Sequence, residues 1–189
     1  AGTAELIKVG FLVSETFLGA VLSMPPQYDD RGRGKWKALM EGAILFKSEI
    51  VAHDPFDRQL RRVLNFGHTF AHAVETAEGY RRYHHGEAVL AGMAAALFLS
   101  HAMGHLSKKR LVEYLQYING PVTGLKPLSK PTTAYLAPMK FDKKNSGDYP
   151  TFVLLEAIGR PLLCSAPSER DIRDAIIRMK DFVNTGGKI

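Results

Sequence analysis

The chain has 189 residues, of which 46% are hydrophobic and 23% are charged, and this ordinary composition excludes a disordered, collagen-like or fibrous protein. The net charge of +6 at pH 7 suits a small polyanion. The basic residues form no long run and are not interleaved with aromatic residues, so we expect no nucleic-acid partner. The longest apolar stretch, 88–99, is too short to span a membrane. The single cysteine, Cys164, excludes an internal disulfide and favours a cytoplasmic location.

The spacing of apolar residues predicts a mainly helical domain over 1–189, with one small β-hairpin. Asp54-Pro55 is expected to begin a new helix, and a proline-containing stretch, 120–138, is expected to form loop and a short helix. Two short β-like runs flank Ile158-Gly159 and predict the hairpin. Helices are predicted over 4–23 (as one or two helices), 35–51, 58–77, 86–103, 107–117 and from Ser168 to Gly186-Gly187.

The start of the chain lacks a methionine and lies inside a predicted helix. We therefore expect an excised domain or a trimmed fragment. No Gly-x-Gly-x-x-Gly motif lies between a predicted strand and a predicted helix, so we do not expect this chain to form a dinucleotide site by itself.

Histidines are concentrated in one part of the sequence: four of the seven fall between residues 68 and 85. His68 and His72 are four residues apart and share a helix face, and His85-Gly86-Glu87 offers a third imidazole at a helix start. Two imidazoles and a carboxylate make a catalytic metal site. The alternative is a set of hydrogen-bonded histidines near a helix end. His101 and His105 have the same spacing but no nearby carboxylate, so we expect them to be surface or hydrogen-bonded histidines.

Several strings then show a family resemblance. Residues 65–75 are NFGHTFAHAVE, which resembles the Asn-x-Gly-His-x-x-Gly-His-x-x-Glu signature of 3-dehydroquinate synthases, although Ala71 stands where that family usually has glycine. The strings HGEAV at 85–89, AELIK at 4–8 and DKKN at 142–145 also resemble family strings and come in the family's order. A hairpin string follows at 152–159.

The resemblance implies a fold and a metal site. Members of the family have an N-terminal Rossmann-like domain that binds NAD and a mostly helical C-terminal domain, and this chain resembles only the second. The implied ligands of a divalent ion, zinc or cobalt, are Glu5, His68 and His85. Glu75, seven residues after His68, is expected either to orient a histidine or to lie on the surface.

The resemblance also implies a reaction, the cyclisation of 3-deoxy-arabino-heptulosonate 7-phosphate to 3-dehydroquinate with loss of phosphate. NAD carries the transient oxidation, and an aldol step closes the ring. His72, Lys47 and Asn65 are the implied catalytic residues. Substrate binding is implied for Lys8, Lys47, Arg61, Asn65 and Lys143, with Lys144 as the alternative to Lys143.

Three other interpretations remain. Related sugar phosphate cyclases act on sugars without the carboxylate, but Asn65, His72 and the late lysine are of the dehydroquinate synthase type. A non-catalytic metal-binding domain and an iron-type alcohol dehydrogenase are the others.

The implied partners are the N-terminal NAD domain, a phosphorylated sugar acid and, at full length, a second subunit. We expect the isolated chain to be inactive.

Overall fold

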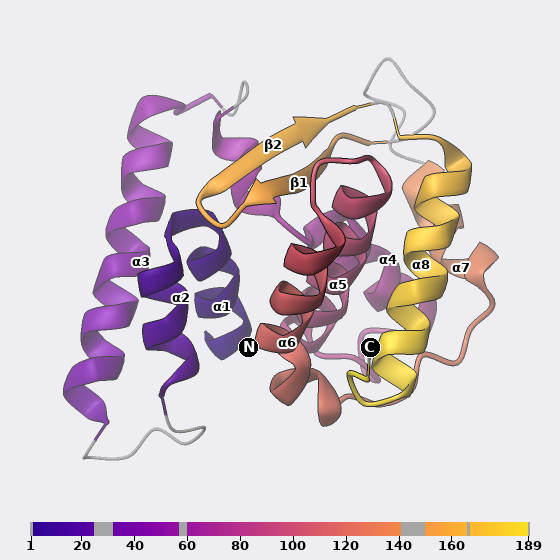
Figure 1. The fold of residues 1–189 in the computed structure, drawn as a ribbon, viewed down its shortest axis with the longest axis horizontal. Helices are drawn as coiled ribbons and strands as arrows, with labels where there is room; N and C mark the ends of the chain where they lie inside the picture. Colours follow the sequence, from indigo (N-terminus) through magenta and orange to yellow (C-terminus); the bar gives the residue numbers. More distant parts are fainter. Residues whose placement is uncertain (1, 25–31, 57–59, 141–149, 166, 189) are drawn as a thin grey trace.

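The computed structural model describes residues 2–24, 32–56, 60–140, 150–165 and 167–188. In Figure 1, helices surround the central α5 and an antiparallel hairpin crosses one end of the molecule. This arrangement confirms the predicted mainly helical fold with a small β-hairpin. In chain order the elements are α1 Gly2–Val13, α2 Glu15–Leu22, α3 Arg33–His53, the 3-10 helix η1 Leu60–Asn65, α4 His68–Glu78, α5 His85–Ala102, α6 Lys108–Thr123, α7 Thr132–Lys140, β1 Phe152–Ala157, β2 Arg160–Cys164 and α8 Glu169–Asn184.

Helix α5 forms the centre of the core because its sequence is apolar on every face. Every residue from Gly86 to Ser100 except Glu87 is buried. The helix packs against α1, α4, α6, α8 and β1. The buried Ser100 hydroxyl donates to the Ala96 carbonyl at 2.6 Å and accepts from the Leu155 amide at 3.0 Å. That hydroxyl therefore fastens the hairpin to the central helix without leaving a buried polar group unpaired.

The contact between α4 and α5 depends on two glycines. Gly67, which precedes α4, has a φ of 78°, a left-handed conformation that favours glycine. A Cβ atom on Gly92 of α5 would lie 2.1 Å from the Gly67 carbonyl oxygen and 2.8 Å from the amide nitrogen of the buried Ala71. Because no side chain fits there, the start of α4 lies directly against α5.

The hairpin links the two sides of the molecule. Figure 1 shows α1, α2 and α3 on one side of α5 and α7 and α8 on the other. The Gly159 amide in the hairpin turn donates to the Phe11 carbonyl of α1 at 2.9 Å. At the other end of the chain, Ser168 caps α8 by accepting from the Asp171 amide at 3.1 Å. Both the hairpin and this helix start agree with the sequence prediction.

The end of α4 is anchored by the buried carboxylate of Glu78. It accepts hydrogen bonds from the Ser129 amide at 2.6 Å, the Lys130 amide at 3.2 Å and the Tyr135 hydroxyl at 2.5 Å. The Arg82 guanidinium lies 3.1 Å away. These contacts hold α7 and the segment before it against α4.

The predicted single helix over 58–77 is wrong. Among the described residues, η1 ends at Asn65, and α4 begins only at His68 because the left-handed Gly67 cannot continue a right-handed helix. Asp54 does not begin a new helix either. It ends α3, and its side chain accepts from the Arg61 amide at 3.0 Å.

The predicted end of the helix at residue 117 is also wrong, since α6 continues through Pro121 to Thr123. An interior proline costs about 3 kcal/mol, but Ile118 and Val122 extend the buried stripe of the helix. Burial of this stripe offsets the cost of the proline. Helix α7 likewise contains Pro138 inside the region predicted to be loop and short helix.

The rest of the protein buries only some of the apolar side chains of helix α3. Its Trp36, Ala43 and Ile50 are buried as the apolar spacing predicts, but Met40 is 42% exposed and Ile44 62% exposed. Both line an apolar cavity of about 360 Å³ between α1 and α3. Within the described part of the chain, no helix has the combined length and apolarity of a membrane span.

Candidate metal centre

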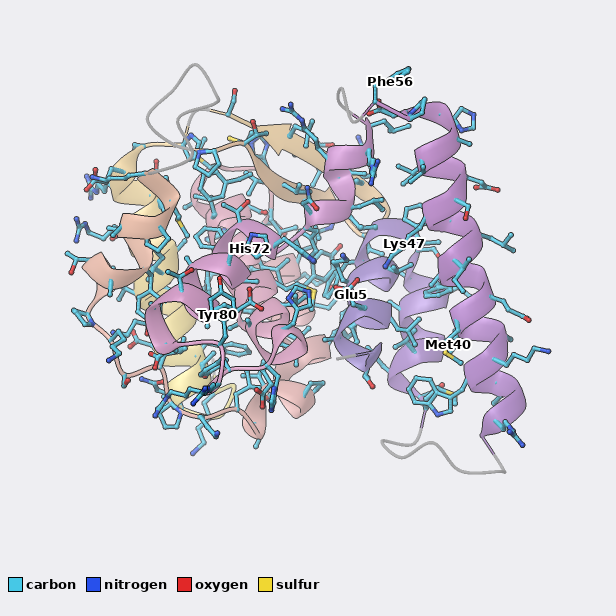
Figure 2. The ribbon with its side chains drawn as sticks, turned by 180° about the vertical axis from the view of Figure 1, so that it is seen from behind. Glu5, Met40, Lys47, Phe56, His72 and Tyr80 are labelled. Atoms are coloured by element: carbon cyan, nitrogen blue, oxygen red, sulfur yellow. The ribbon has the colours of Figure 1, made fainter. Side chains whose placement is uncertain are left out.

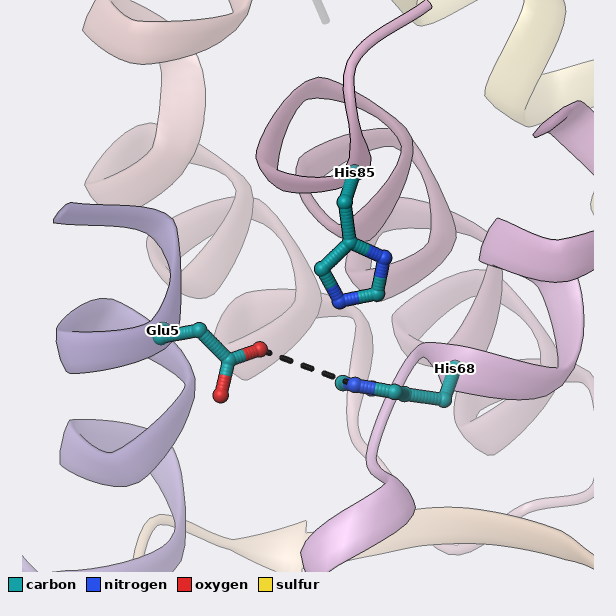
Figure 3. A group of neighbouring side chains, drawn as sticks. All are labelled: Glu5, His68 and His85. Atoms are coloured by element: carbon teal, nitrogen blue, oxygen red, sulfur yellow. Dashed lines mark ion pairs between the residues drawn. The ribbon is translucent and has the colours of Figure 1, made fainter. Parts of the chain in front are cut away.

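Three helix starts bring together one carboxylate and two imidazoles. Glu5 lies in the first turn of α1, and His68 and His85 are the first residues of α4 and α5. One potential ligand atom from each lies within 4.8 Å of the others, and Figure 3 shows the three side chains pointing toward a common region. The glycine contact between α4 and α5 brings the start of α4, where His68 lies, directly against α5. Their role as metal ligands remains a prediction.

The two imidazoles present the same nitrogen to this region. His68 Nδ1 donates to the Phe66 carbonyl at 3.3 Å, and His85 Nδ1 donates to the Glu75 carboxylate at 3.0 Å. In a neutral ring with its proton on Nδ1, the Nε2 atom carries the lone pair that can bind a metal ion. His68 Nε2 lies 3.6 Å from Glu5 Oε1.

Only one of the two carboxylate oxygens of Glu5 is paired with the neighbouring lysines. Its Oε2 atom lies 3.1 Å from both the Lys8 and Lys47 ammonium groups. Its Oε1 atom is buried and has no hydrogen-bond partner among the described residues. Burial raises the pKa of Glu5, but the two lysines outweigh it and hold the pKa below its ordinary value. An ionised carboxylate with one unpaired buried oxygen fits a bound cation.

The protonation of His68 and Lys8 agrees with that arrangement. Burial, and then the positive charge of Lys8, lower the pKa of His68 to about 4, so its imidazole is neutral at pH 7 and can donate a lone pair. Burial also lowers the pKa of Lys8, against the opposing effect of Glu5. Lys8 is 3% exposed, and its ammonium pairs with Glu5 at 3.1 Å.

A cationic cavity adjoins the cluster. Its volume is about 250 Å³, and four of the predicted substrate-binding residues line it together with Leu64: Lys8, Lys47, Arg61 and Asn65. Figure 2 shows Lys47 reaching from α3 toward Glu5 on α1. The two lysines therefore border both the metal cluster and the cavity. Lys143 and Lys144 lie outside the described residues.

His72 has a different position from the other predicted catalytic residues. Its ring centre lies 6.1 Å from that of His68, but it lines a separate cavity of about 240 Å³ between α4 and the region of Pro138 and Pro150. Figure 2 shows it on α4, away from Lys47. The structure thus brings Lys47 and Asn65 into one cavity and leaves His72 outside it.

The sequence left two interpretations of Glu75 open, and the structure distinguishes them. The Glu75 side chain is only 8% exposed and faces His85, so it is not a surface residue.

His101 donates from Nδ1 to the Leu106 carbonyl at 2.7 Å, as expected for a hydrogen-bonded histidine. The Phe66 carbonyl beside His68 carries no side-chain signal and was not predictable from the sequence.

Comparisons of structures define the class of this fold. A 2-epi-5-epi-valiolone synthase from Streptomyces hygroscopicus, determined with NAD+ and Zn2+, superposes with a TM-score of 0.69 and 25% identity over 95% of this chain and 50% of its own. A 2-deoxy-scyllo-inosose synthase superposes with a TM-score of 0.66 over 97% of this chain and 51% of its own, and its 18% identity supports the fold alone. Both are sugar phosphate cyclases.

Comparisons of sequence give the family. Residues 2–145 match the family described as 3-dehydroquinate synthase C-terminal, and the chain belongs to this family. The 3-dehydroquinate synthase of Corynebacterium jeikeium is 37% identical over 93% of this chain and 47% of its own length. That of Salinibacter ruber is 34% identical over 93% and 48%. The chain therefore spans about half the length of the curated relatives it matches.

Proposed function

We propose that this chain is the metal- and substrate-binding part of a 3-dehydroquinate synthase, a phosphate-eliminating lyase. The substrate would be 3-deoxy-arabino-heptulosonate 7-phosphate. Membership of the family and the names of the relatives support this proposal. The observation that carries it is the cluster of one carboxylate and two imidazoles beside a cavity lined by two lysines and an arginine.

The metal would be held by Glu5, His68 and His85. The unpaired buried oxygen of Glu5 and the two outward Nε2 atoms are the donor set that zinc or cobalt accepts. When bound, a divalent ion polarises the hydroxyl groups of the sugar. The valiolone synthase was determined with Zn2+ and the deoxy-scyllo-inosose synthase with Co2+.

The cationic cavity would hold an anionic end of the substrate. The Lys47 side chain is 39% exposed and lines the cavity with Arg61, so both can pair with a carboxylate or phosphate. We assign Asn65 a neutral hydrogen bond to the substrate and Lys143 a further cationic contact. Lys47 and Asn65 would orient the reacting groups.

His72 would transfer a proton. An imidazole is suited to this role near neutral pH. Because His72 lines a different cavity from the cationic one and its ring centre lies 6.1 Å from that of His68, the substrate would have to extend past His68 to reach it. If the N-terminal half of a relative restores phosphate release to this chain but not to a His72→Gln variant that still binds metal and substrate, the result would support this role.

The other half of the protein would supply NAD. The relatives are about twice as long as this chain, and we assign the additional half to an N-terminal Rossmann-like domain. Its cofactor would supply the transient oxidation that acidifies the carbon next to the leaving phosphate. We further propose a homodimer at full length, a cytoplasmic location and a single helical domain over 1–189.

A second candidate is another sugar phosphate cyclase. The resemblance to the valiolone synthase, with a TM-score of 0.69 at 25% identity, favours this alternative. The two candidates differ in whether the substrate carries a carboxylate. Three cations, Lys8, Lys47 and Arg61, line the cavity, and this number suits a substrate with a carboxylate and a phosphate better than one with a phosphate alone.

The experiment measures phosphate release. The chain is incubated with the heptulosonate phosphate, NAD+ and Zn2+ or Co2+, alone and with the N-terminal half of a relative. We expect release only when that half is present. Release by the chain alone that needs both NAD+ and the metal would contradict the two-domain part of the proposal. Faster turnover of sedoheptulose 7-phosphate would favour the second candidate.

A further inference from the structure

We propose that Glu75 is a positioning residue for His85: its carboxylate holds the imidazole with Nε2 directed toward Glu5 and His68. The role rests on the proposed metal centre. Glu75 would not touch the ion or the substrate.

The geometry places Glu75 at the rear of the His85 ring. Its Oε1 atom lies 3.0 Å from His85 Nδ1. Figure 3 shows one ring nitrogen of His85 directed toward Glu5 and His68 and the other directed away from them. Since Nδ1 is the nitrogen engaged by Glu75, the hydrogen bond fixes both the ring orientation and the position of its proton.

Helix α4 carries both His68 and the carboxylate that contacts His85. Glu75 follows His68 by seven residues on α4, and seven residues are close to two full helical turns, so both side chains lie on the same face. α4 therefore presents one proposed ligand directly and orients the other through Glu75.

His85 needs such support more than His68 does. The His68 side chain is 16% exposed and donates to the carbonyl of its near neighbour Phe66. The His85 side chain is 46% exposed and stands at the first position of α5. Little packing restricts its rotation, so the hydrogen bond to Glu75 restrains it instead.

The burial of Glu75 supports a positioning role. The side chain is 8% exposed, and a buried carboxylate costs free energy unless it is paired. The His85 ring nitrogen is the one hydrogen-bond partner of this carboxylate among the described residues. Glu75 therefore depends on His85 for its pairing, and His85 depends on Glu75 for the orientation of its ring.

The test is metal affinity, measured on Glu75→Gln and Glu75→Ala by competition for Zn2+ with a chromophoric chelator. Loss of an outer carboxylate typically weakens metal binding about 10–100-fold, so we expect a loss of this size for E75A and a smaller loss for E75Q, which keeps an acceptor. The Co2+ absorption spectrum should also change in E75A, because the ring of His85 is no longer held. Circular dichroism confirms that each variant is folded.

The control is Glu87→Gln, which removes the same charge two residues after His85. Glu87 accepts from the His84 amide at 2.7 Å, and among the described residues no hydrogen bond or ion pair joins it to the ring of His85. We expect its affinity for Zn2+ to stay within about threefold of the wild type. Equal losses in E75Q and E87Q, or no loss in E75A, would overturn the proposal. If the wild-type chain itself takes up no Zn2+, the proposed metal centre fails, and the role of Glu75 fails with it.

Discussion

Replacing Gly92 by alanine should force α4 and α5 apart. The added methyl carbon would lie 2.1 Å from the Gly67 carbonyl oxygen and 2.8 Å from the Ala71 amide nitrogen. A carbon and an oxygen in ordinary contact lie at about 3.3 Å or more, so the two helices must separate by roughly 1 Å. Both obstacles are backbone atoms, which cannot rotate away as a side chain can.

The cost of G92A should be at the upper end of the range for an overpacked core, about 3 kcal/mol. For a protein of this size that corresponds to a fall in Tm of about 6–12 °C. Urea denaturation and thermal unfolding followed by circular dichroism measure the loss. Affinity for Zn2+ should fall too, because His68 follows Gly67 directly and would move relative to His85.

The matched control is Gly19→Ala in α2, where an added Cβ meets no atom within 4 Å. Alanine favours a helix more than glycine does, so G19A should leave the stability unchanged or raise it by up to about 1 kcal/mol. If G92A is as stable as G19A, the close approach of α4 and α5 is not what the structure indicates, and the explanation for the position of His68 against α5 is refuted.

Two further predictions concern Glu78 and Arg61. Burial raises the pKa of Glu78, but hydrogen bonds, first that from Tyr135, outweigh it and hold the pKa below its ordinary value of 4.5. The charged form therefore stabilises the fold above pH 4.5, and this contribution is lost as the pH falls through the lower pKa of the folded state. E78Q should be about 1.5–3 kcal/mol less stable than the wild type at pH 7, and urea denaturation should show this difference shrinking below pH 4.5; a constant difference would contradict the assignment. R61A should bind a phosphonate analogue of the substrate at least about tenfold more weakly, as expected for loss of a charged hydrogen bond. Calorimetry measures it, with R62A as the control, and equal affinities for the two variants would exclude Arg61 from the site.

Local signals were enough to predict much of the fold. Ser168 can accept a hydrogen bond at a helix start, and Ile158-Gly159 separates two β-like runs, so α8 and the hairpin follow from neighbouring residues. Asn65-Phe66-Gly67 weakens the middle of the predicted helix over 58–77, but the contact of Gly67 with Gly92 involves a helix more than twenty residues away in the chain and gives no local signal. The continuation of α6 through Pro121 depends likewise on burial of its far end.

The candidate site was predictable in a different way. The spacing of His68 and His72 suggests a metal-binding pair, yet the structure joins His68 with His85 and Glu5, which come from different helices. No periodicity relates those positions, and only the family resemblance suggested the set. Whether Glu75 faces His85 or solvent depends on how α4 packs on α5, which the sequence pattern does not specify.

The most direct test of the account is an anomalous diffraction map at the zinc edge, from crystals of this chain grown with one equivalent of Zn2+. The account predicts one strong peak bonded to Glu5, His68 and His85 at about 2.0–2.2 Å, and its loss in His68→Ala. A peak at any other group of side chains, or no peak at stoichiometric zinc, would contradict the central claim that these three residues form the metal centre.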